Sequence, residues 1–426
     1  MKIIVASYYP PFYPGVDYTL LNHCRLLSRD HEVVLVCGVR DESEKEKTNT
    51  VTRRFCSALY MAQMPIAQYA SNNCFDFTFM SWLQGAYNIV RTLCGRQPFS
   101  RFLFFPMMFS FSRRFSQLLR EAIANEKPAV VHLHDIHASI HIGDIPLDIP
   151  AVYCAIDSVS RYFYTQARCA PRGALKTYYR FRYAGARAWE RFAFPRYRRV
   201  VVMTQAEKEW IVSQAIEGAV EVITLGVDTA FFAPLAAAQE PHTVLFSGLM
   251  SYEPNIDAVV YFMRAILPLV RKMTPDVSFV IVGANPPPSI RALARNPRII
   301  VTGYVEDLRP FIARAHVYIA PLRSGAGIKS KLLIAMSMAK AVVATTDALR
   351  GIEGLRDGEH LLIADTPAVF AQKIQLLFSD QRLARGLGAR ARAFVDTHYG
   401  WEHWYQQFSR LYETLAHGDK TRSVLP

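Results

Sequence analysis

The sequence predicts an α/β protein made of two consecutive parallel-sheet domains. Short apolar runs alternate with segments of helical spacing, which is the pattern of repeated βαβ units. The pattern stops in the Ala- and Pro-rich stretch Phe231 to Pro241 and then restarts. A chain of 426 residues has room for two such domains. Two parallel-sheet domains in succession indicate two halves facing a ligand cleft.

The composition excludes several classes of protein. With 51% hydrophobic and 20% charged residues, the chain is not disordered. No apolar run has the length of a membrane-spanning helix, and Met1-Lys2 leads directly into a strand-like run without an export signal. All seven cysteines precede Ala170 and none forms a C-x-x-C pair, which favours reduced thiols over disulfides or zinc. We therefore expect a cytoplasmic protein.

The first residues read as a βαβ unit. Residues 2–7 form a strand, residues 18–29 have helical spacing, and residues 33–37 form a second strand. Gly15 in the first loop stands alone, so the G-x-G-x-x-G fingerprint of dinucleotide binding is missing. This half is Rossmann-like without NAD. Residues 41–54 are charged and read as a solvated loop.

A polar cluster follows the next strand. Ala129 to Leu133 is apolar except for His132, and His134 and Asp135 come directly after it. Alternation along a strand places His132 and His134 on one face. Parallel α/β sheets bind ligands at this end of their strands. The chain offers no second ligand cluster, so we predict no metal ion here.

Two basic regions account for much of the net charge of +13. Residues 75–115 mix aromatic and arginine side chains, which suits either a surface in a lipid headgroup layer or ordinary core helices. Residues 161–199 hold eleven Lys or Arg against one acid, Glu190, and read as a basic amphipathic helix. An anionic membrane surface fits both regions, as does a solvated helix face. No RRM, KH or zinc signature accompanies them, so we predict no nucleic-acid partner.

The remaining elements complete two α/β halves. After Ala151 to Ala155, further strands are expected at 199–204, 220–225, 244–247, 278–282, 299–302, 317–321, 341–344 and 359–364, and further helices at 207–213, 258–273, 308–314, 367–378, 381–397 and 401–416. The predicted organisation is an N-terminal domain 1–232, a linker 233–242, a C-terminal domain 243–398, a helix within 399–417 that crosses back to the N-terminal domain, and a polar tail 418–426.

The stretch from Tyr318 to Gly351 has the layout of an anion site. A strand ends in a loop with Gly325 and Gly327, and a helix-period segment follows. The first turn of that helix offers unpaired N–H groups, and Lys329 and Lys331 add positive charge there. On spacing alone, an ordinary βαβ turn with two solvated lysines explains the stretch equally well.

Taken together, the motifs resemble the retaining group 1 glycosyltransferases, whose GT-B architecture has two Rossmann-like domains facing a cleft. The resemblance covers nearly the whole chain and rests on the order and spacing of its motifs, namely His31-Glu-Val, His132-Leu-His134-Asp135, Leu225-Gly-Val-Asp228, Phe246-Ser-Gly248 with Pro254-Asn255, Gly303 to Leu308, Ser324 to Lys331 and Gly351-Ile-Glu-Gly354. The block Asp157 to Trp210 further resembles a subgroup of polysaccharide-biosynthesis sugar transferases.

The resemblance implies transfer of a sugar from a nucleotide-diphosphate donor, with retention, to a saccharide or polyprenyl-lipid-linked acceptor, at the inner face of the plasma membrane and without a cofactor. His134 would contact the transferred sugar, and Lys329 would act with it on the leaving diphosphate. The implied donor-binding residues are Gly15, Gly248, Gly303, Val305, Glu306, Ser324, Gly325, Ala326, Gly327, Ile328, Lys331 and Ile334.

The chain departs from the family pattern around that loop. Ile334 stands where the family usually has the Glu that holds the ribose hydroxyls, and Ala339 and Ala341 replace a Gly and a Pro. Loss of the carboxylate removes a charge-assisted hydrogen-bond acceptor, worth about 1.5–3 kcal/mol of donor binding. A second interpretation is therefore a degenerate transferase that serves as a binding or assembly subunit of a polysaccharide-synthesis complex.

Overall fold

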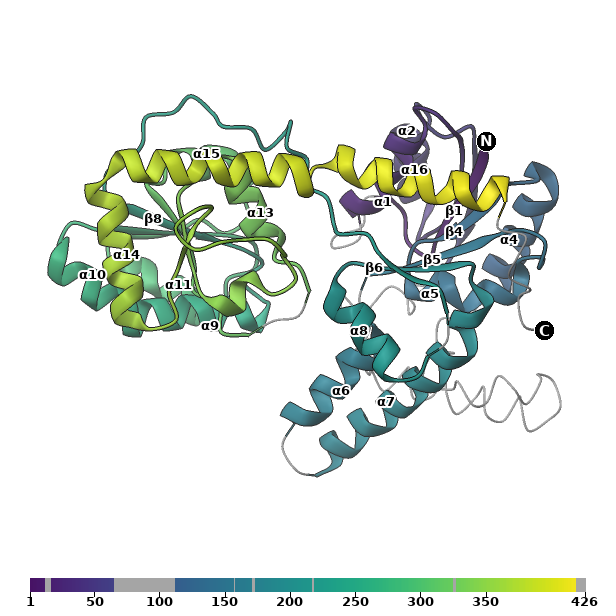
Figure 1. The fold of residues 1–426 in the computed structure, drawn as a ribbon, viewed down its shortest axis with the longest axis horizontal. Coiled ribbons are helices and arrows are strands. Elements are labelled where there is room, and N and C mark those ends of the chain that lie inside the picture. Colours follow the sequence, from purple (N-terminus) through teal and green to yellow (C-terminus); the bar gives the residue numbers. More distant parts are fainter. Residues whose placement is uncertain are drawn as a thin grey trace. The chain divides into compact units, whose positions relative to one another are not determined.

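The chain folds into two α/β units, which the computed structural model shows in Figure 1. The first unit holds Met1–Thr224 and Tyr405–Pro426, and the second holds Leu225–Trp404. The chain thus divides ahead of the predicted linker, and again inside its last helix, α16 (Trp401–His417). The structure describes residues 1–11, 17–64, 112–156, 158–170, 173–216, 218–324 and 327–418.

The described strands of the first unit form one parallel sheet in the order β3-β2-β1-β4-β5-β6-β7. Its strands are β1 (Lys2–Ser7), β2 (Glu32–Val39), β3 (Ala58–Gln63), β4 (Val130–Leu133), β5 (Ala151–Ala155), β6 (Arg199–Val202) and β7 (Val220–Val222). β1, β4 and β5 are buried at successive positions, so both faces of the sheet are covered. The α/β prediction is confirmed for this unit.

The described helices of the first unit connect these strands. They are α1 (Asp17–Leu27), α2 (Glu42–Thr52), α4 (Arg113–Glu126), α5 (Ile136–Ser139), α6 (Val159–Cys169), α7 (Ala174–Ala193) and α8 (Gln205–Ser213). The prediction of a loop at 41–54 was wrong, because α2 occupies it. The carboxylate of Asp41 accepts a hydrogen bond from the Glu44 amide at 2.8 Å and caps the helix, which its charged composition conceals.

The second unit has its own parallel sheet, in the order β10-β9-β8-β11-β12-β13. Its strands are β8 (Thr243–Ser247), β9 (Ser278–Val282), β10 (Ile299–Val301), β11 (Val317–Ala320), β12 (Val342–Ala344) and β13 (Leu362–Ile363). The described helices around it are α9 (Glu253–Tyr261), α10 (Leu267–Met273), α11 (Pro288–Arg291), α12 (Arg309–Arg314), α13 (Ser330–Ser337), α14 (Pro367–Ser379) and α15 (Gln381–His398).

The helix predicted over 258–273 is interrupted. A π-helical turn, Phe262–Ile266, separates α9 from α10. Pro268 lacks an N–H group and cannot donate to the carbonyl of Arg264, so the ladder is broken at this point. The turn closes instead with a bond from the Leu267 amide to the Phe262 carbonyl.

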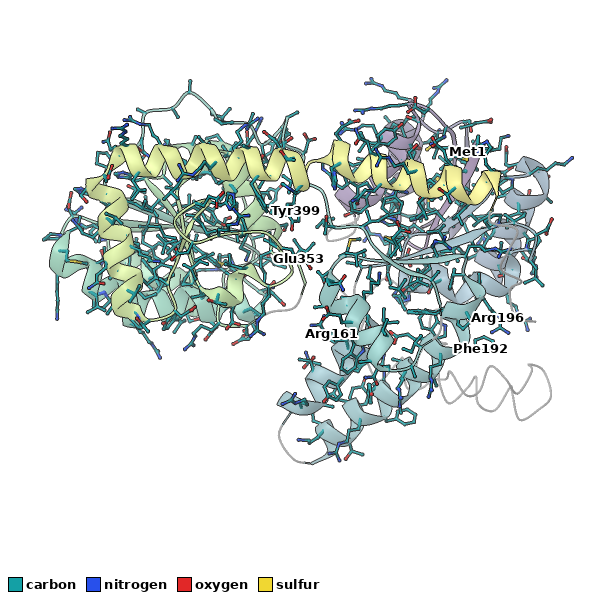
Figure 2. The ribbon with its side chains drawn as sticks, viewed as in Figure 1. Met1, Arg161, Phe192, Arg196, Glu353 and Tyr399 are labelled. Atoms are coloured by element: carbon teal, nitrogen blue, oxygen red, sulfur yellow. The ribbon has the colours of Figure 1, made fainter. Side chains whose placement is uncertain are left out.

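The predicted basic segment 161–199 contains two helices rather than one. α6 and α7 pack against one another in the first unit (Figure 1). At the end of α7, the guanidinium of Arg196 lies 3.7 Å from the centre of the Phe192 ring (Figure 2). Most of the other predicted basic region, 75–115, lies outside the described residues.

None of the described helices has the length and apolar character needed to cross a membrane. The described cysteines Cys24, Cys37, Cys56 and Cys154 are free thiols.

Candidate functional site

Each sheet places its candidate residues at the point where the strand order reverses. In the first sheet this point lies between β1 and β4, and in the second between β8 and β11. Crevices outside the carboxyl ends of such strands are the usual ligand sites of open α/β sheets. His134 follows β4, and Gly248 and the Ser324–Lys331 loop follow β8 and β11.

His134 is held by a network that joins the ends of β1 and β4. Its backbone amide donates to the Ala6 carbonyl at 2.9 Å. The next residue, Asp135, accepts hydrogen bonds from the Ser7 hydroxyl at 2.9 Å and from the Tyr8 amide at 2.7 Å. The other oxygen of Asp135 caps α5 through the amides of His137 and Ala138. The backbone at His134 is therefore fixed from both sides.

The imidazole of His134 belongs to a buried polar chain within the first unit. Its Nδ1 lies 3.1 Å from Nε2 of His132, as expected for two residues on one face of a strand. Nδ1 of His132 lies 2.6 Å from the hydroxyl of Tyr412 on α16, which in turn lies 2.9 Å from Nε2 of His23 on α1. The His132, His134 and Tyr412 side chains are fully or almost fully buried.

Burial keeps these groups neutral. Loss of solvation lowers the pKa of His134 to about 4 and lowers the pKa values of His23 and His132 well below their usual range. Burial also raises the pKa of the Tyr412 hydroxyl well above its ordinary value. At neutral pH, each imidazole therefore carries one proton and the tyrosine stays protonated.

The chemistry of this cluster does not suit a metal ion. Atoms of His132, His134 and Cys154 that could act as ligands lie within 4.8 Å of one another. However, the two imidazoles already face each other at hydrogen-bonding distance. Burial raises the pKa of the Cys154 thiol to about 12, so the thiolate that a metal prefers is disfavoured. The absence of a metal remains a prediction, supported by this donor set.

In the second unit, glycines follow three neighbouring strands. Gly248 comes after β8, Gly283 after β9, and Gly303 shortly after β10. The backbones meet here, because the Gly248 amide donates to Val282 and the Gly283 amide donates to Gly303. A Cβ on Gly283 would lie 1.8 Å from the Gly248 carbonyl oxygen, so only glycine fits that position. This leaves an edge with half-buried backbone and little side-chain bulk.

Lys331 reaches this edge from α13. A Cβ on Gly248 would lie 2.6 Å from its ammonium nitrogen and 2.8 Å from the Asn255 amide nitrogen. The ammonium donates to the side-chain oxygen of Asn255 and lies 4.9 Å from the centre of the Phe246 ring. Burial lowers the pKa of Lys331 to about 7, and the charge of Lys329 acts in the same direction. The cation therefore sits in a place that disfavours its charge.

Lys329 lies beside it in the loop that leads into α13. Its ammonium donates to the Gly327 carbonyl at 2.7 Å, and the side chain is almost fully buried. Gly327 has a φ of 66°, a left-handed conformation that favours glycine. Ser324 is exposed, and Ile328 packs partly against the core. The predicted residues Gly15, Gly325 and Ala326 lie outside the described part of the chain.

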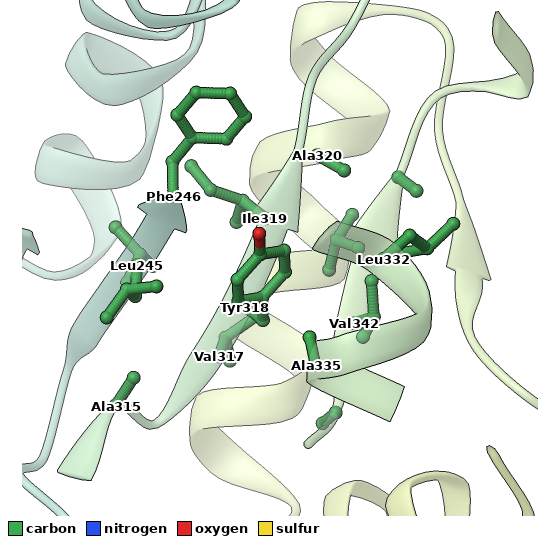
Figure 3. Close-up of a cluster of buried hydrophobic side chains, with 14 of the residues drawn as sticks. Leu245, Phe246, Ala315, Val317, Tyr318, Ile319, Ala320, Leu332, Ala335 and Val342 are labelled. Carbon is green, nitrogen blue, oxygen red and sulfur yellow. The ribbon is translucent and has the colours of Figure 1, made fainter. Parts of the chain in front are cut away.

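Packing of α13 on the sheet fixes the two lysines. Leu332 and Ala335 point into the core beside Ile319 and Val342 (Figure 3). Tyr318 of β11 is anchored below them by a 2.8 Å hydrogen bond between its hydroxyl and that of Ser247. Ile334 is partly buried against the same core, so it is an apolar residue with a packing role at the predicted ribose position.

Gly303, one of the predicted donor-binding residues, lines a cavity of about 310 Å³, near the lower limit for small-molecule sites. Its lining residues are Pro286, Arg291, Ala294, Val301, Thr302 and Gly303. Gly303 has a φ of 71°, and a Cβ there would meet nothing within 4 Å. Val305 packs partly against the core, whereas Glu306 is exposed.

Comparisons with known proteins indicate the family of the chain. Residues 14–231, just over half of the chain, match the model described as Glycosyltransferase Family 4. Residues 241–380 match the model described as Glycosyl transferases group 1. The chain belongs to the glycosyltransferases, with a first half of the family 4 type and a second half of the group 1 type.

Solved structures place the transferase in the GT-B fold, as predicted. Sucrose-phosphate synthase from Thermosynechococcus elongatus matches with a TM-score of 0.64 and 14% identity, over 97% of this chain and 98% of that chain. Anabaena HepE in complex with UDP matches with a TM-score of 0.62 and 12% identity, over 97% and 100%. TarM matches with a TM-score of 0.67 and 12% identity, over 97% and 99%.

A curated relative gives one further indication. An uncharacterized 44.6 kDa protein in the cps region of Klebsiella pneumoniae is 27% identical over 165 residues. The match spans 37% of the transferase and 42% of that protein, less than half the length of either.

Sequence reasoning placed His132 beside His134 in the first unit and Lys329 beside Lys331 in the second. It missed Tyr412 and His23 beside His132, because the contact between Tyr412 and His132 joins residues 280 positions apart. The amphipathic spacing of the last helix predicted a buried face, but no sequence signal marked the hydroxyl that this face carries.

Proposed function

We propose that the protein transfers a sugar from a nucleotide-diphosphate donor, with retention, to a growing polysaccharide or a lipid-linked acceptor. One observation carries this proposal. A buried Lys329 and a half-buried Lys331 lie beside a glycine-lined edge at the carboxyl ends of β8 and β11. Burial, together with the charge of Lys329, lowers the pKa of Lys331, so a dianionic ligand beside them would stabilise its protonated form. A diphosphate supplies that charge.

Support for the donor comes from the neighbours. The HepE structures contain UDP, and one of them contains UDP-glucose. The glycine edge and the cavity beside Gly303 offer a nucleotide a place for its phosphates and its base. The cps-region relative supports a polysaccharide acceptor.

The proposed reaction needs no nucleophile from the protein. The bond between the anomeric carbon and the phosphate oxygen breaks, and the nucleoside diphosphate leaves with the electron pair. The acceptor oxygen then bonds to the anomeric carbon on the same face, and its proton passes to the departing phosphate. Lys329 and Lys331 stabilise the charge that develops on the diphosphate. His134 contacts the transferred sugar.

A donor panel tests this function. The purified protein is incubated with UDP-, GDP- and dTDP-sugars, with and without a lipid-linked saccharide acceptor, and release of the nucleoside diphosphate is measured. We expect release from one nucleotide class, stimulated by the acceptor, with an α-linkage from an α-donor. Absence of release from every donor under both conditions would contradict the proposal.

Ile334 supports a second candidate, a binding or assembly subunit without transferase activity. An isoleucine side chain cannot accept hydrogen bonds from ribose hydroxyls. The discriminating variant is Ile334→Glu, assayed by calorimetry with UDP and GDP. Tighter binding in the variant favours a degenerate site, whereas weaker binding favours an active site rebuilt around an apolar residue. The conservative Ile334→Leu controls for packing.

An exposed face of α7 supports attachment to an anionic membrane. Phe181 and Ala184 are exposed beside Arg180 and Arg191, so aromatic and basic groups share one side of the helix. Basic residues near such a membrane contribute about 1 kcal/mol each. This supports our proposal that the transferase attaches to the inner face of the plasma membrane.

Vesicle co-sedimentation tests the attachment. We expect binding to phosphatidylserine vesicles that exceeds binding to neutral vesicles and falls in the double variant Arg180→Glu with Arg191→Glu. The matched control reverses two exposed arginines of α15, Arg382→Glu with Arg385→Glu. Equal binding to both vesicle types, or equal loss in both double variants, would count against the α7 surface.

A further inference from the structure

The buried chain His23–Tyr412–His132–His134 has one open end. Nε2 of His134 is buried and has no hydrogen-bond partner among the described residues. A buried imidazole nitrogen without a partner is costly, because it has left water without compensation. Every other link in the chain is made, and the atom left unmatched lies at the carboxyl end of β4.

The distances give the chain a direction. The 2.6 Å separation between the Tyr412 oxygen and Nδ1 of His132 fits a bond donated by an O–H group. The 2.9 Å separation between Nε2 of His23 and the Tyr412 oxygen fits a bond donated by an N–H group. The shorter separation to His132 thus favours the arrangement in which Tyr412 accepts from His23 and donates to His132.

The tautomer of His132 determines the tautomer of His134. Because His132 is neutral and accepts at Nδ1, its single proton is on Nε2. That proton points to Nδ1 of His134, 3.1 Å away, which must therefore accept. His134 is also neutral, so its own proton is on Nε2, the unmatched atom. The opposite direction would place a lone pair there.

We propose that His23, Tyr412 and His132 act as positioning residues that hold His134 in its Nε2–H tautomer, so that it donates a hydrogen bond to an oxygen of the bound sugar. The role of the sugar rests on the proposed function, whereas the tautomer does not. A neutral donor recognises a hydroxyl or ring oxygen without adding charge to the site. Tyr412 acts on the ligand only through the two imidazoles, and α16 thus supplies a residue that sets the chemistry at the end of β4.

The tautomer is measured by long-range ¹H–¹⁵N correlation spectra of the full-length protein labelled on its histidine rings. The His134 signals are assigned by their loss in His134→Gln. We expect one neutral tautomer with the proton on Nε2 throughout pH 6 to 8. A proton on Nδ1 of His134, or an equal mixture of tautomers in the unmodified protein, would overturn the proposal without reference to any variant.

Tyr412→Phe breaks the chain and leaves the aromatic ring in place against His132 and Phe408. We expect His134 to become a mixture of tautomers, and kcat/KM to fall about threefold to tenfold, the loss of one hydrogen bond. The matched control is Tyr405→Phe. Tyr405 lies on the same helix and donates its hydroxyl to Asp30, away from the chain. It should change neither the His134 spectrum nor kcat/KM.

A double-mutant cycle separates positioning from support of the fold. His134→Gln keeps an N–H donor and has no tautomers. If Tyr412 acts through His134, Tyr412→Phe lowers kcat/KM in the parent protein but not in the His134→Gln background. Equal losses in both backgrounds would mean that Tyr412 only supports the structure, and would overturn its positioning role.

The proposed function and this inference fail in different ways. If no donor is turned over but the spectra show the Nε2–H tautomer and its loss in Tyr412→Phe, the positioning role of Tyr412 is supported and the transferase function is contradicted. If turnover is normal but Tyr412→Phe leaves the tautomer unchanged, the transferase function is supported and the positioning role is contradicted.

Discussion

The two units treat their buried titratable groups in opposite ways. In the first, three histidines and Tyr412 stay neutral and satisfy one another in a single line that ends at His134. In the second, the charge of the buried Lys329 acts with partial burial to lower the pKa of Lys331. The first cluster is nearly complete without a ligand. The second holds positive charge that a bound anion would stabilise further.

The two clusters therefore have different effects on a ligand: the first orients a hydrogen-bond donor, and the second supplies positive charge. A neutral, fully linked chain determines where a proton points, and it contributes little to the energy of binding an anion. A pair of poorly solvated ammonium groups contributes affinity for a diphosphate, because the ligand relieves an existing repulsion. The contrast predicts that substitutions of the lysines in the second unit change the affinity for a diphosphate strongly. Substitutions of the histidines and Tyr412 in the first unit should change it weakly.

The largest expected effect is on Lys331. Lys331→Met keeps the unbranched stem of the side chain but removes its ammonium group. It should weaken binding of the nucleoside diphosphate product by about 10- to 100-fold, the value of a charged hydrogen bond. The measurement is isothermal calorimetry with the diphosphate that the donor panel identifies. An affinity within twofold of that of the parent protein would contradict the claim that the lysines of the second unit bind the diphosphate.

Lys272→Met is the matched control for this measurement. Lys272 is an exposed lysine of α10 in the same unit. It should leave the affinity unchanged, because an exposed cation away from the glycine edge is already solvated. A similar loss in both variants would indicate general electrostatic attraction rather than a site at Lys331.

The next expected effect is on the pH dependence of diphosphate affinity, to which Lys331 should contribute and His134 should not. With a pKa of about 7, Lys331 loses its proton above neutral pH, so affinity for the diphosphate should fall towards tenfold per pH unit. Calorimetry at pH 8 in two buffers of different ionisation enthalpy should show proton uptake on binding, and Lys331→Met should abolish it. His134 should not titrate over this range. Binding without proton uptake would contradict the assignment.

The same pKa values set the signs for stability. Between about pH 7 and 10.5 the unfolded chain holds a proton that folded Lys331 has lost, so the free energy of unfolding rises with pH across that window. Between about pH 4 and 6.5 the unfolded chain protonates the residue that folded His134 keeps neutral. The contribution of His134 to stability is therefore lost as pH falls through that window.

Local sequence signals predicted the second cluster better than the first. The spacing of glycines and lysines in one loop and one helix start was enough to place Lys329 and Lys331 together. Alternation along β4 paired His132 with His134, but their partners come from α1 and α16, and periodicity gives only the face of a helix that is buried. Helix α2 was missed because its cap, Asp41, sits in a run of charges without an apolar stripe.

The smallest expected effect concerns the other end of α13, where the second unit is again strained. Ala339 has a φ of 54°, and the Lys340 amide bonds to the Ala335 carbonyl, as in a helix end that favours glycine. Ala339→Gly should therefore raise the free energy of unfolding by about 1 kcal/mol, the penalty of a left-handed alanine. Chemical denaturation measures it. Ala389→Gly, in the exposed interior of α15, should lower stability by about 1 kcal/mol instead. If both Ala339→Gly and Ala389→Gly lowered the free energy of unfolding, the backbone at the end of α13 would be unstrained. Lys329 and Lys331 would then be the unfavourable feature left in this comparison of the two units.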